Sequence, residues 1–262
     1  MEKHTVSASL TDNTKYMNRA LPVKKSFDII ERNLIIGGQN SAFYFIDGFT
    51  KDETMLKLMD SFLNISADDM PEDATSFSTS CIPYVEVDIL GDFDSIFKNL
   101  LSGVTCLFID GYEAAIAIDC RTYPSRSIEE PDKDKSLRGS RDGFVETIVF
   151  NTALMRRRIR DPHLIMEMYE AGTSTRTDVA LCYMSDRVDR ELLTTIQNKL
   201  EESKSQDLKM SQQSLAESLF QRKWYNPFPK YKFTERPDTA CACLMEGKVI
   251  LLTDTSPSAL IL

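Results

Sequence analysis

The sequence predicts an α/β (α+β) fold made of two small mixed-sheet subdomains, which are duplicates separated by a cleft and joined by a helix-containing linker. Three observations support this prediction. Short aromatic and β-branched runs alternate with helical patterns along the chain. A stretch rich in Pro, Ser, Gly and charge, residues 121–143, interrupts the alternation. Residues 100–118 and 244–262 match without a gap.

The first half begins with a polar segment, residues 1–26, which is expected to form an N-terminal arm. The first subdomain then covers residues 27–124. Its expected elements are a strand at 41–48 that ends in an Asp-Gly turn, a helix at 51–65, a strand at 84–90, a glycine-stopped helix at 92–103 and a hairpin at 104–118.

The second half begins with the linker, residues 125–162, which carries a helix at 144–159. The second subdomain covers residues 163–262 and repeats the order of the first. Its expected elements are a strand pair at 163–184 around Gly172, helices at 189–203 and 214–224, an irregular Pro-rich stretch at 225–233, a helix at 238–247 and a closing hairpin at 248–262.

The duplication rests on identities at matching positions of the two closing hairpins. They are Leu100/Leu244, Gly103/Gly247, Leu107/Leu251, Asp110/Asp254 and Ala115/Ala259. The alternative is that two unrelated α/β hairpins share these common features. We favour a repeat because the upstream strand and helix also recur in the same order. Two lobes would leave a cleft between them, which is a usual place for a ligand.

Charge separates one segment from the rest of the chain. The 262 residues carry a formal net charge of -9, which argues against general binding to nucleic acid or an acidic membrane. Residues 138–160 are the exception, because six arginines against Asp142 and Glu146 give +4 there and leave -13 for the remainder. This segment is therefore a candidate anion site, nucleic-acid contact or joint in an assembly.

The cysteines and the two ends of the sequence indicate the cellular compartment in which the protein is expected. Six scattered cysteines without paired zinc spacing indicate a reducing, cytosolic environment. The N-terminus lacks the apolar core of a signal peptide, and no run of 18 apolar residues is present. The sequence stops inside an apolar strand, SALIL, so we expect a longer protein with a membrane region after residue 262. No metal or other cofactor is expected.

Four motifs carry a resemblance to a known family. They are PDKDKSLRGSRDGFVETIVFNTALMRRRIRDPHL, RTDVALCYM, NPFPKYKFTERPD and LMEGKVILLTDTSPSALIL. In this order they resemble the A-type subunits of the GerA family of spore germination proteins, from about residue 25 to the end. SRDG, where receptor A subunits tend to carry PREG, and CRTYP indicate one branch of that family.

The resemblance implies a role that composition does not show. It implies a cytosol-facing N-terminal domain of two α/β subdomains, followed by a multi-helix region in the spore inner membrane. It also implies an oligomeric ion channel that responds to, or amplifies, a germinant signal. The implied partners are other germination-protein subunits and further copies of the full-length protein, with no nucleic acid.

The arginine helix is the first candidate site. On a helical wheel, Phe144, Ile148, Met155 and Ile159 fall within roughly 60° and predict a buried face. Arg158 lies near its edge and is expected to be partly buried, hydrogen-bonded to carbonyls or a carboxylate, and needed for the fold, whereas Arg156 and Arg157 remain available to acidic neighbours. The alternative is a solvated basic face. The proposed assembly or inter-lobe residues are Arg138, Gly139, Ser140, Arg141, Asp142, Gly143, Asn151, Arg156, Arg157 and Arg158.

The other candidates have simpler alternatives. The RGSRDG loop has the glycines and arginines of an anion cradle, but Asp142 is better explained as a helix N-cap. Glu235, Arg236, Pro237 and Asp238 of TERPD are expected to order a loop and not to form a catalytic trio. Asp110 and Asp254 read as turn residues. His4 and His163 lie far apart in sequence, and no nucleophile signature accompanies either of them.

The sequence therefore predicts a non-enzymatic assembly and signalling domain of a germination protein. Two rivals remain open. One is a sensor that binds an amino acid or sugar in the inter-lobe cleft, and the other is a hydrolase that uses the carboxylates of TERPD.

Overall fold

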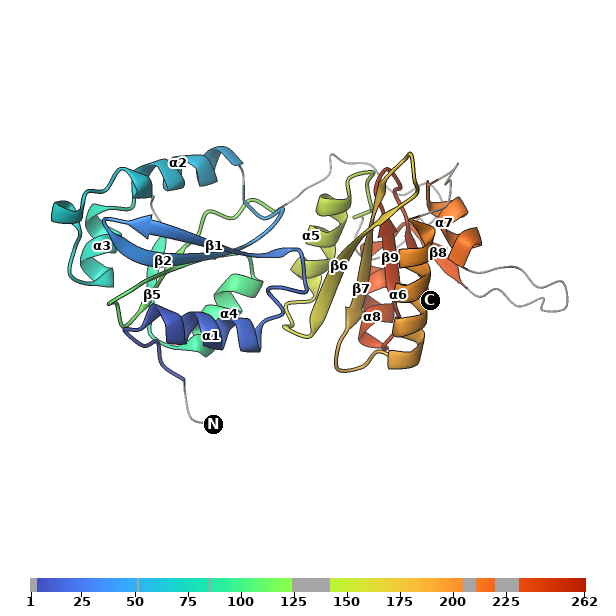
Figure 1. Cartoon of the computed structure of the whole chain (residues 1–262), viewed down its shortest axis with the longest axis horizontal. Coiled ribbons are helices and arrows are strands. Elements are labelled where there is room, and N and C mark those ends of the chain that lie inside the picture. The colour runs from blue at the N-terminus through green and yellow to red at the C-terminus, as the bar shows by residue number, and fades with distance from the viewer. Residues whose placement is uncertain (1–3, 51, 85, 124–141, 205–210, 220–230) are drawn as a thin grey trace, which may run out of the picture. The chain divides into compact units, whose positions relative to one another are not determined.

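The computed structural model describes residues 4–50, 52–84, 86–123, 142–204, 211–219 and 231–262. Their contacts divide the chain into two units, Met1–Pro124 and Ser125–Leu262. Each unit contains a five-stranded sheet with helices on both faces (Figure 1). None of the helices in the described ranges has the length and apolar character that a bilayer crossing requires.

The first unit is built on a sheet with the strand order β1-β2-β4-β5-β3. The helices α1 and α4 lie on one face, and α2 and α3 lie on the other (Figure 1). Its elements are α1 (Leu10–Ala20), β1 (Ile29–Ile36), β2 (Gln39–Ile46), α2 (Asp52–Leu63), the 3₁₀ turn η1 (Ala67–Asp69), α3 (Ala74–Ser80), β3 (Val87–Leu90), α4 (Phe93–Leu101), β4 (Thr105–Ile109) and β5 (Ala115–Ile118).

The second unit has the corresponding order β6-β7-β9-β10-β8. The helices α5 and α8 pack together on one face of its sheet, and α6 and α7 cover the other. Its elements are α5 (Ile148–Arg158), β6 (Leu164–Ala171), β7 (Thr177–Met184), α6 (Arg190–Ser203), α7 (Ser211–Leu219), β8 (Lys232–Thr234), α8 (Pro237–Met245), β9 (Ile250–Thr253) and β10 (Ala259–Ile261).

The α+β class is confirmed, and the two units share one topology. Strand order and the order of the α-helices and strands agree, η1 being an addition of the first unit within the described residues, and each unit starts with a helix of 11 residues followed by two strands of 8. The sheets are not mixed as expected, because every pairing between the named strands is antiparallel. Hairpins supply four of the eight strand pairs, β1-β2, β4-β5, β6-β7 and β9-β10, and a hairpin can only pair antiparallel strands.

The leading helices show that each structural repeat is longer than the sequence match. Residues 1–26 are not a separate arm, since they carry α1, whose Met17 is fully buried on the first sheet. The helix of the expected linker is α5, which packs on the second sheet through fully buried Met155. The structure therefore groups both segments with the units, while residues 125–141 of the linker lie outside the described ranges. The cleft between the lobes stays a prediction.

A buried asparagine closes the loop before each leading helix. In the second unit, Asn151 Oδ1 accepts from the Val145 N–H at 2.8 Å, and Asn151 Nδ2 donates to Val145 O at 2.6 Å. Asn13 makes the same two bonds to Ser7 in the first unit, at 2.9 and 2.6 Å. One amide side chain thus satisfies both backbone groups of a residue six positions upstream, which fixes the entry into the helix.

An aspartate from the closing hairpin then caps each leading helix. The Leu10 N–H donates to Asp110 Oδ1 at 2.9 Å, and the Ile148 N–H donates to Asp254 Oδ1 at 3.1 Å. The next residue of each turn reinforces the contact, since the Thr255 N–H donates to Glu146 O at 2.7 Å. The two aspartates are turn residues, as expected. Each also binds the N-terminus of a leading helix, a contact that the sequence analysis did not predict because the two residues lie about 100 positions apart.

We expect Asn151→Ala to destabilise the second unit by about 1–3 kcal/mol, because the substitution leaves two backbone groups of Val145 without these partners. Asn13→Ala should have an effect of the same size on the first unit. Scanning calorimetry measures both. The control is Asn64→Ala, which removes an exposed asparagine whose bonds go only to Asp60. Melting of Asn151→Ala indistinguishable from that of the control would contradict the role.

Candidate functional site

The arginine segment and the TERPD motif meet in the second unit. The Phe144 N–H donates to Glu235 O at 2.9 Å, and both Gly143 and Phe144 are buried. The first part of the expected site, Arg138–Arg141, lies outside the described residues, so the anion-binding hypothesis for that loop stays untested. Two motifs far apart in sequence are therefore neighbours in the fold.

Four side chains form what we call the arginine–aspartate cluster: Asp142, Arg158, Arg236 and Asp238. Arg158 Nη2 donates to Asp142 Oδ2 at 2.8 Å, with 27% and 52% of the two side chains exposed. Arg236 Nε donates to Asp238 Oδ1 at 3.0 Å, and its Nη2 reaches the other oxygen of the same carboxylate. The charge of Arg158 also acts on Asp238, so the two ion pairs are electrostatic neighbours.

Asp238 is held as a carboxylate. The hydrogen bond from Arg236 lowers its pKa below the usual value, and the Thr239 N–H and the charge of Arg158 act in the same direction against partial burial. Such a group accepts hydrogen bonds at neutral pH and holds no proton to donate. Pro237 occupies the first turn of α8, where its missing N–H costs nothing. This geometry suits a motif that orders a loop and starts a helix.

Arg156 is fully buried, so the expectation that it stays available to acidic neighbours was wrong, whereas Arg158 is partly exposed and bonded to the Asp142 carboxylate. The Arg156 side chain is among the largest fully buried side chains in the described ranges. Nη1 donates to Asp161 O at 3.1 Å, and Nη2 donates to Leu164 O at 3.0 Å. The guanidinium thereby ties the end of α5 to the first residue of β6. Arg157 is exposed.

The helical wheel failed because α5 is buried on more than one side. It contacts both the sheet, through β7 and β9, and α8. Six successive residues, from Asn151 to Arg156, are buried as a result. A single 60° face cannot describe such a helix, and Arg156 falls inside the wider buried arc. The N-cap expectation for Asp142 was also wrong, since α5 starts only at Ile148 and its N–H bonds to Asp254.

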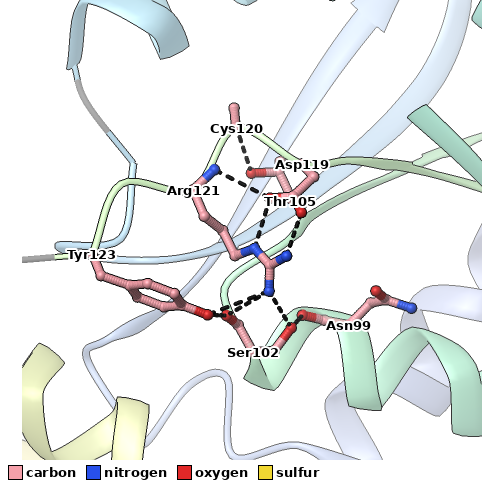
Figure 2. Close-up of polar contacts among 7 residues, drawn as sticks. All are labelled: Asn99, Ser102, Thr105, Asp119, Cys120, Arg121 and Tyr123. Carbon is pink, nitrogen blue, oxygen red and sulfur yellow. Dashed lines mark hydrogen bonds and ion pairs between the residues drawn. The ribbon is translucent and has the colours of Figure 1, made fainter. Parts of the chain in front are cut away.

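A second polar cluster, which the sequence analysis did not identify as a site, lies in the first unit. Figure 2 shows the Arg121 guanidinium between Asp119 and Ser102. Arg121 Nε donates to Asp119 Oδ1 at 2.6 Å, and Nη1 donates to Ser102 Oγ at 3.1 Å. The Tyr123 hydroxyl donates to Ser102 O at 2.8 Å. The available signal was the CRTYP motif, directly after the last strand of the hairpin.

This cluster fixes the chain where it leaves the first unit. Ser102 caps the C-terminus of α4, so Arg121 brings a positive charge to a negative helix end. The Thr122 N–H donates to Phe49 O at 2.6 Å, and the Tyr123 ring packs edge-on against Phe49 at 5.3 Å. An open groove of about 550 Å³ lies beside these residues and is lined by Tyr84, Glu86, Asp119, Arg121 and Tyr123.

The two histidines lie in different units. The ring of His4 contacts that of Tyr16 in the first unit, with centroids 4.7 Å apart and tilted planes, while His163 Nδ1 lies 2.8 Å from Asp161 Oδ1 in the second. In the ranges that the structure describes, no group of His, Cys, Asp and Glu side chains is arranged to hold a metal ion.

Arg156→Met should destabilise the second unit by about 1–3 kcal/mol, because two backbone carbonyls lose a buried charged donor. The matched variant Arg158→Met removes a more exposed ion pair and should cost under about 1 kcal/mol. Urea unfolding of both variants measures the difference. The assignment of roles within α5 would be overturned if Arg158→Met were the more destabilised protein.

Asp238→Asn should reduce the loss of unfolding free energy that the protein shows as the pH falls from 7 to 3. The folded-state pKa of Asp238 is lowered, so its carboxylate stabilises the fold above about pH 4 and loses this effect as the pH falls through the lowered pKa. Unfolding free energies at pH 7 to pH 3 should therefore converge for wild type and variant. Asp178→Asn, at an exposed aspartate, serves as the control. A difference between wild type and Asp238→Asn that stays constant over this range would refute the prediction.

The sequence of the chain is similar to those of known proteins from one family. The family model described as Bacillus/Clostridium GerA spore germination protein matches residues 15–262. Stage V sporulation protein AF of Bacillus subtilis (strain 168) is 34% identical over 261 residues, covering 99% of this chain and 53% of that protein. Spore germination protein KA of the same organism is 29% identical over 260 residues, with 98% and 47% covered. The chain thus spans about half the length of these relatives.

A solved structure shows the same fold. The N-terminal domain of the A subunit of the Bacillus megaterium spore germinant receptor GerK3 matches with a TM-score of 0.72 and 22% identity, covering 100% of this chain and 97% of that one. The SRDG and CRTYP motifs indicate the branch of the family that contains stage V sporulation protein AF, and the similarity to that protein agrees with this interpretation. With a family model that matches nearly its whole length, the chain belongs to the GerA family of spore germination proteins.

Proposed function

We propose that the chain is the cytosol-facing N-terminal part of a spore inner-membrane germination protein. In that protein it assembles with other germination subunits and transmits a germination signal to an ion-conducting membrane region. It acts without catalysing a reaction. The observation that carries this proposal is the family match over residues 15–262, combined with relatives named for sporulation and spore germination that are about twice as long.

Two features of the structure support an assembly role. The fold is that of the N-terminal domain of a receptor A subunit, in which the domain precedes the remainder of the subunit. The TERPD motif is also engaged in loop-ordering bonds, since the Asp238 carboxylate is paired with Arg236 and the backbone carbonyl of Glu235 accepts from the Phe144 N–H. A carboxylate held ionised by an arginine, as Asp238 is, has no proton to donate at neutral pH and so does not supply the acid of general acid–base catalysis.

The exposed end of α5 is the proposed point of contact with a neighbouring subunit. Arg156 anchors the helix end inside the unit, and Arg157 next to it is exposed. An arginine on a rigid, anchored backbone is suited to binding a carboxylate on another chain, because less conformational freedom is lost on pairing. Arg138 and Arg141 of the preceding loop are proposed to extend the same contact.

We expect Arg157→Ala to impair germination without destabilising the chain. An exposed arginine contributes under about 1 kcal/mol to folding, so the melting temperature of the 262-residue chain should stay close to wild type. The same substitution in the full-length protein should slow germination, measured as the fall in optical density of a spore suspension.

The control is Arg190→Ala, at an exposed arginine at the start of α6. It should leave both melting and germination unchanged. Normal germination of Arg157→Ala spores that contain wild-type amounts of the protein would show that this arginine is only a solvated residue.

A further inference from the structure

One face of α2 exposes large apolar side chains that no described element covers. Leu56 is 73% and Leu63 is 58% exposed. Together with Met55, Met59 and Arg32 of β1, they line an open groove of about 630 Å³. The helix lies on the face of the first sheet opposite to α1 and α4 (Figure 1). Exposed apolar surface of this kind on a folded domain marks an interaction site more often than a structural need.

The second unit provides an internal comparison for this face. Counted from the first residue of each helix, Leu56 and Leu63 of α2 correspond to Thr194 and Glu201 of α6. Thr194 bonds to its own helix and Glu201 pairs with Lys204, so both are ordinary surface residues. The shared fold therefore does not require leucine at either position.

The positions that face the core behave differently. Leu58 and Phe62 of α2 correspond to Ile196 and Leu200 of α6, and all four are buried and apolar. Packing on the sheet thus constrains both helices in the same way, and only the outer stripe diverges. The fold therefore requires apolar residues at the core-facing positions of both helices, whereas the exposed leucines are particular to α2.

The spacing of the exposed stripe fits a helical partner. Leu56, Met59 and Leu63 stand at i, i+3 and i+7 along one side of α2, with the two leucines exposed and the largely buried Met59 between them in the lining of the groove. This is the a/d spacing at which one helix receives the apolar face of another. A groove beside such a stripe accommodates a second helix along its length.

Charge identifies the kind of helix. Residues 1–124 carry ten Lys and Arg against nineteen Asp and Glu, a net -9, whereas residues 125–262 carry twenty-one of each. The groove lining itself is balanced, with Arg32 and Lys57 against Asp52 and Asp60. The acidic excess follows α2, where four further exposed acidic residues, Asp68, Asp69, Glu72 and Asp73, stand without a basic residue among them. A second copy of this surface or an anionic membrane would be repelled, and a cationic partner would be attracted.

We propose that the face of α2 formed by Leu56, Met59 and Leu63 docks a basic amphipathic helix of a partner polypeptide. The apolar residues of that helix pack on the stripe, and its lysines or arginines lie over the acidic residues on either side. The inference rests on the proposed assembly function, because it names the chemistry of one partner, but its test is independent of germination.

The test uses a synthetic 18-residue peptide with leucine at i, i+3 and i+7 and lysine at most other positions. Two control peptides carry glutamate for lysine or alanine for leucine. The 262-residue chain is labelled at its methionine methyl groups for NMR. We expect the lysine–leucine peptide to shift the methyl signals of Met55 and Met59 and not that of Met168 in the second unit. The control peptides should leave all three unchanged.

The matched variant carries Leu56→Thr and Leu63→Glu, the residues of α6 at the equivalent positions. It should retain the wild-type melting temperature and bind the peptide at least tenfold more weakly. Equal binding by the variant, or shifts confined to other methionines, would overturn the proposal. So would concentration-dependent dimerisation, or binding to vesicles of anionic lipid, that the double substitution abolishes. Because no spores are involved, failure here is distinguishable from failure of the germination role.

Discussion

In both units the leading helix starts on a carboxylate supplied by the turn of the closing hairpin, Asp110 for α1 and Asp254 for α5. The bond joins the beginning of a unit to its end. It offsets one of the four N–H groups that a helix start leaves unpaired, and it places a negative charge at the positive helix end. With the loop before the helix closed by Asn13 or Asn151, the helix can adopt only one position over its sheet.

The position of α5 decides what the arginine segment does. Anchored at its start by Asp254 and packed against both the sheet and α8, the helix carries Arg156 to the beginning of β6. There the guanidinium donates to the backbone carbonyl oxygens of Asp161 and Leu164. Arg158, two residues after Arg156 and the last residue of α5, bonds to Asp142 beside the Arg236–Asp238 pair. Arginine residues adjacent in sequence thus serve different purposes, one inside the unit and the others at its surface.

The duplicated fold has diverged most in the surfaces that it presents. The first unit holds the whole net negative charge and an exposed leucine stripe on α2, while the second is neutral overall and polar at the equivalent helix positions. The clusters that order the chain differ as well. Arg121 fixes the exit of the first unit through Asp119 and Ser102 (Figure 2). Arg236 fixes the start of α8 through Asp238. The two units thus keep the same buried positions and differ in their surfaces, as expected if each unit contacts a different partner.

The sequence by itself determined the α+β class, the repeat and most strand and helix positions, because hydrophobic periodicity, glycine stops such as Gly103 and Gly247, and Asp turns are local signals. It also marked TERPD and the arginine segment as special. It did not reveal α1 as part of the first unit, the capping role of Asp254, or which arginine is buried. Each of these depends on residues distant in the chain: the partner of the Ile148 N–H lies in the closing hairpin, and the burial of Arg156 follows from packing against two neighbours. A helical wheel contains neither contact, so only the tertiary structure could decide them.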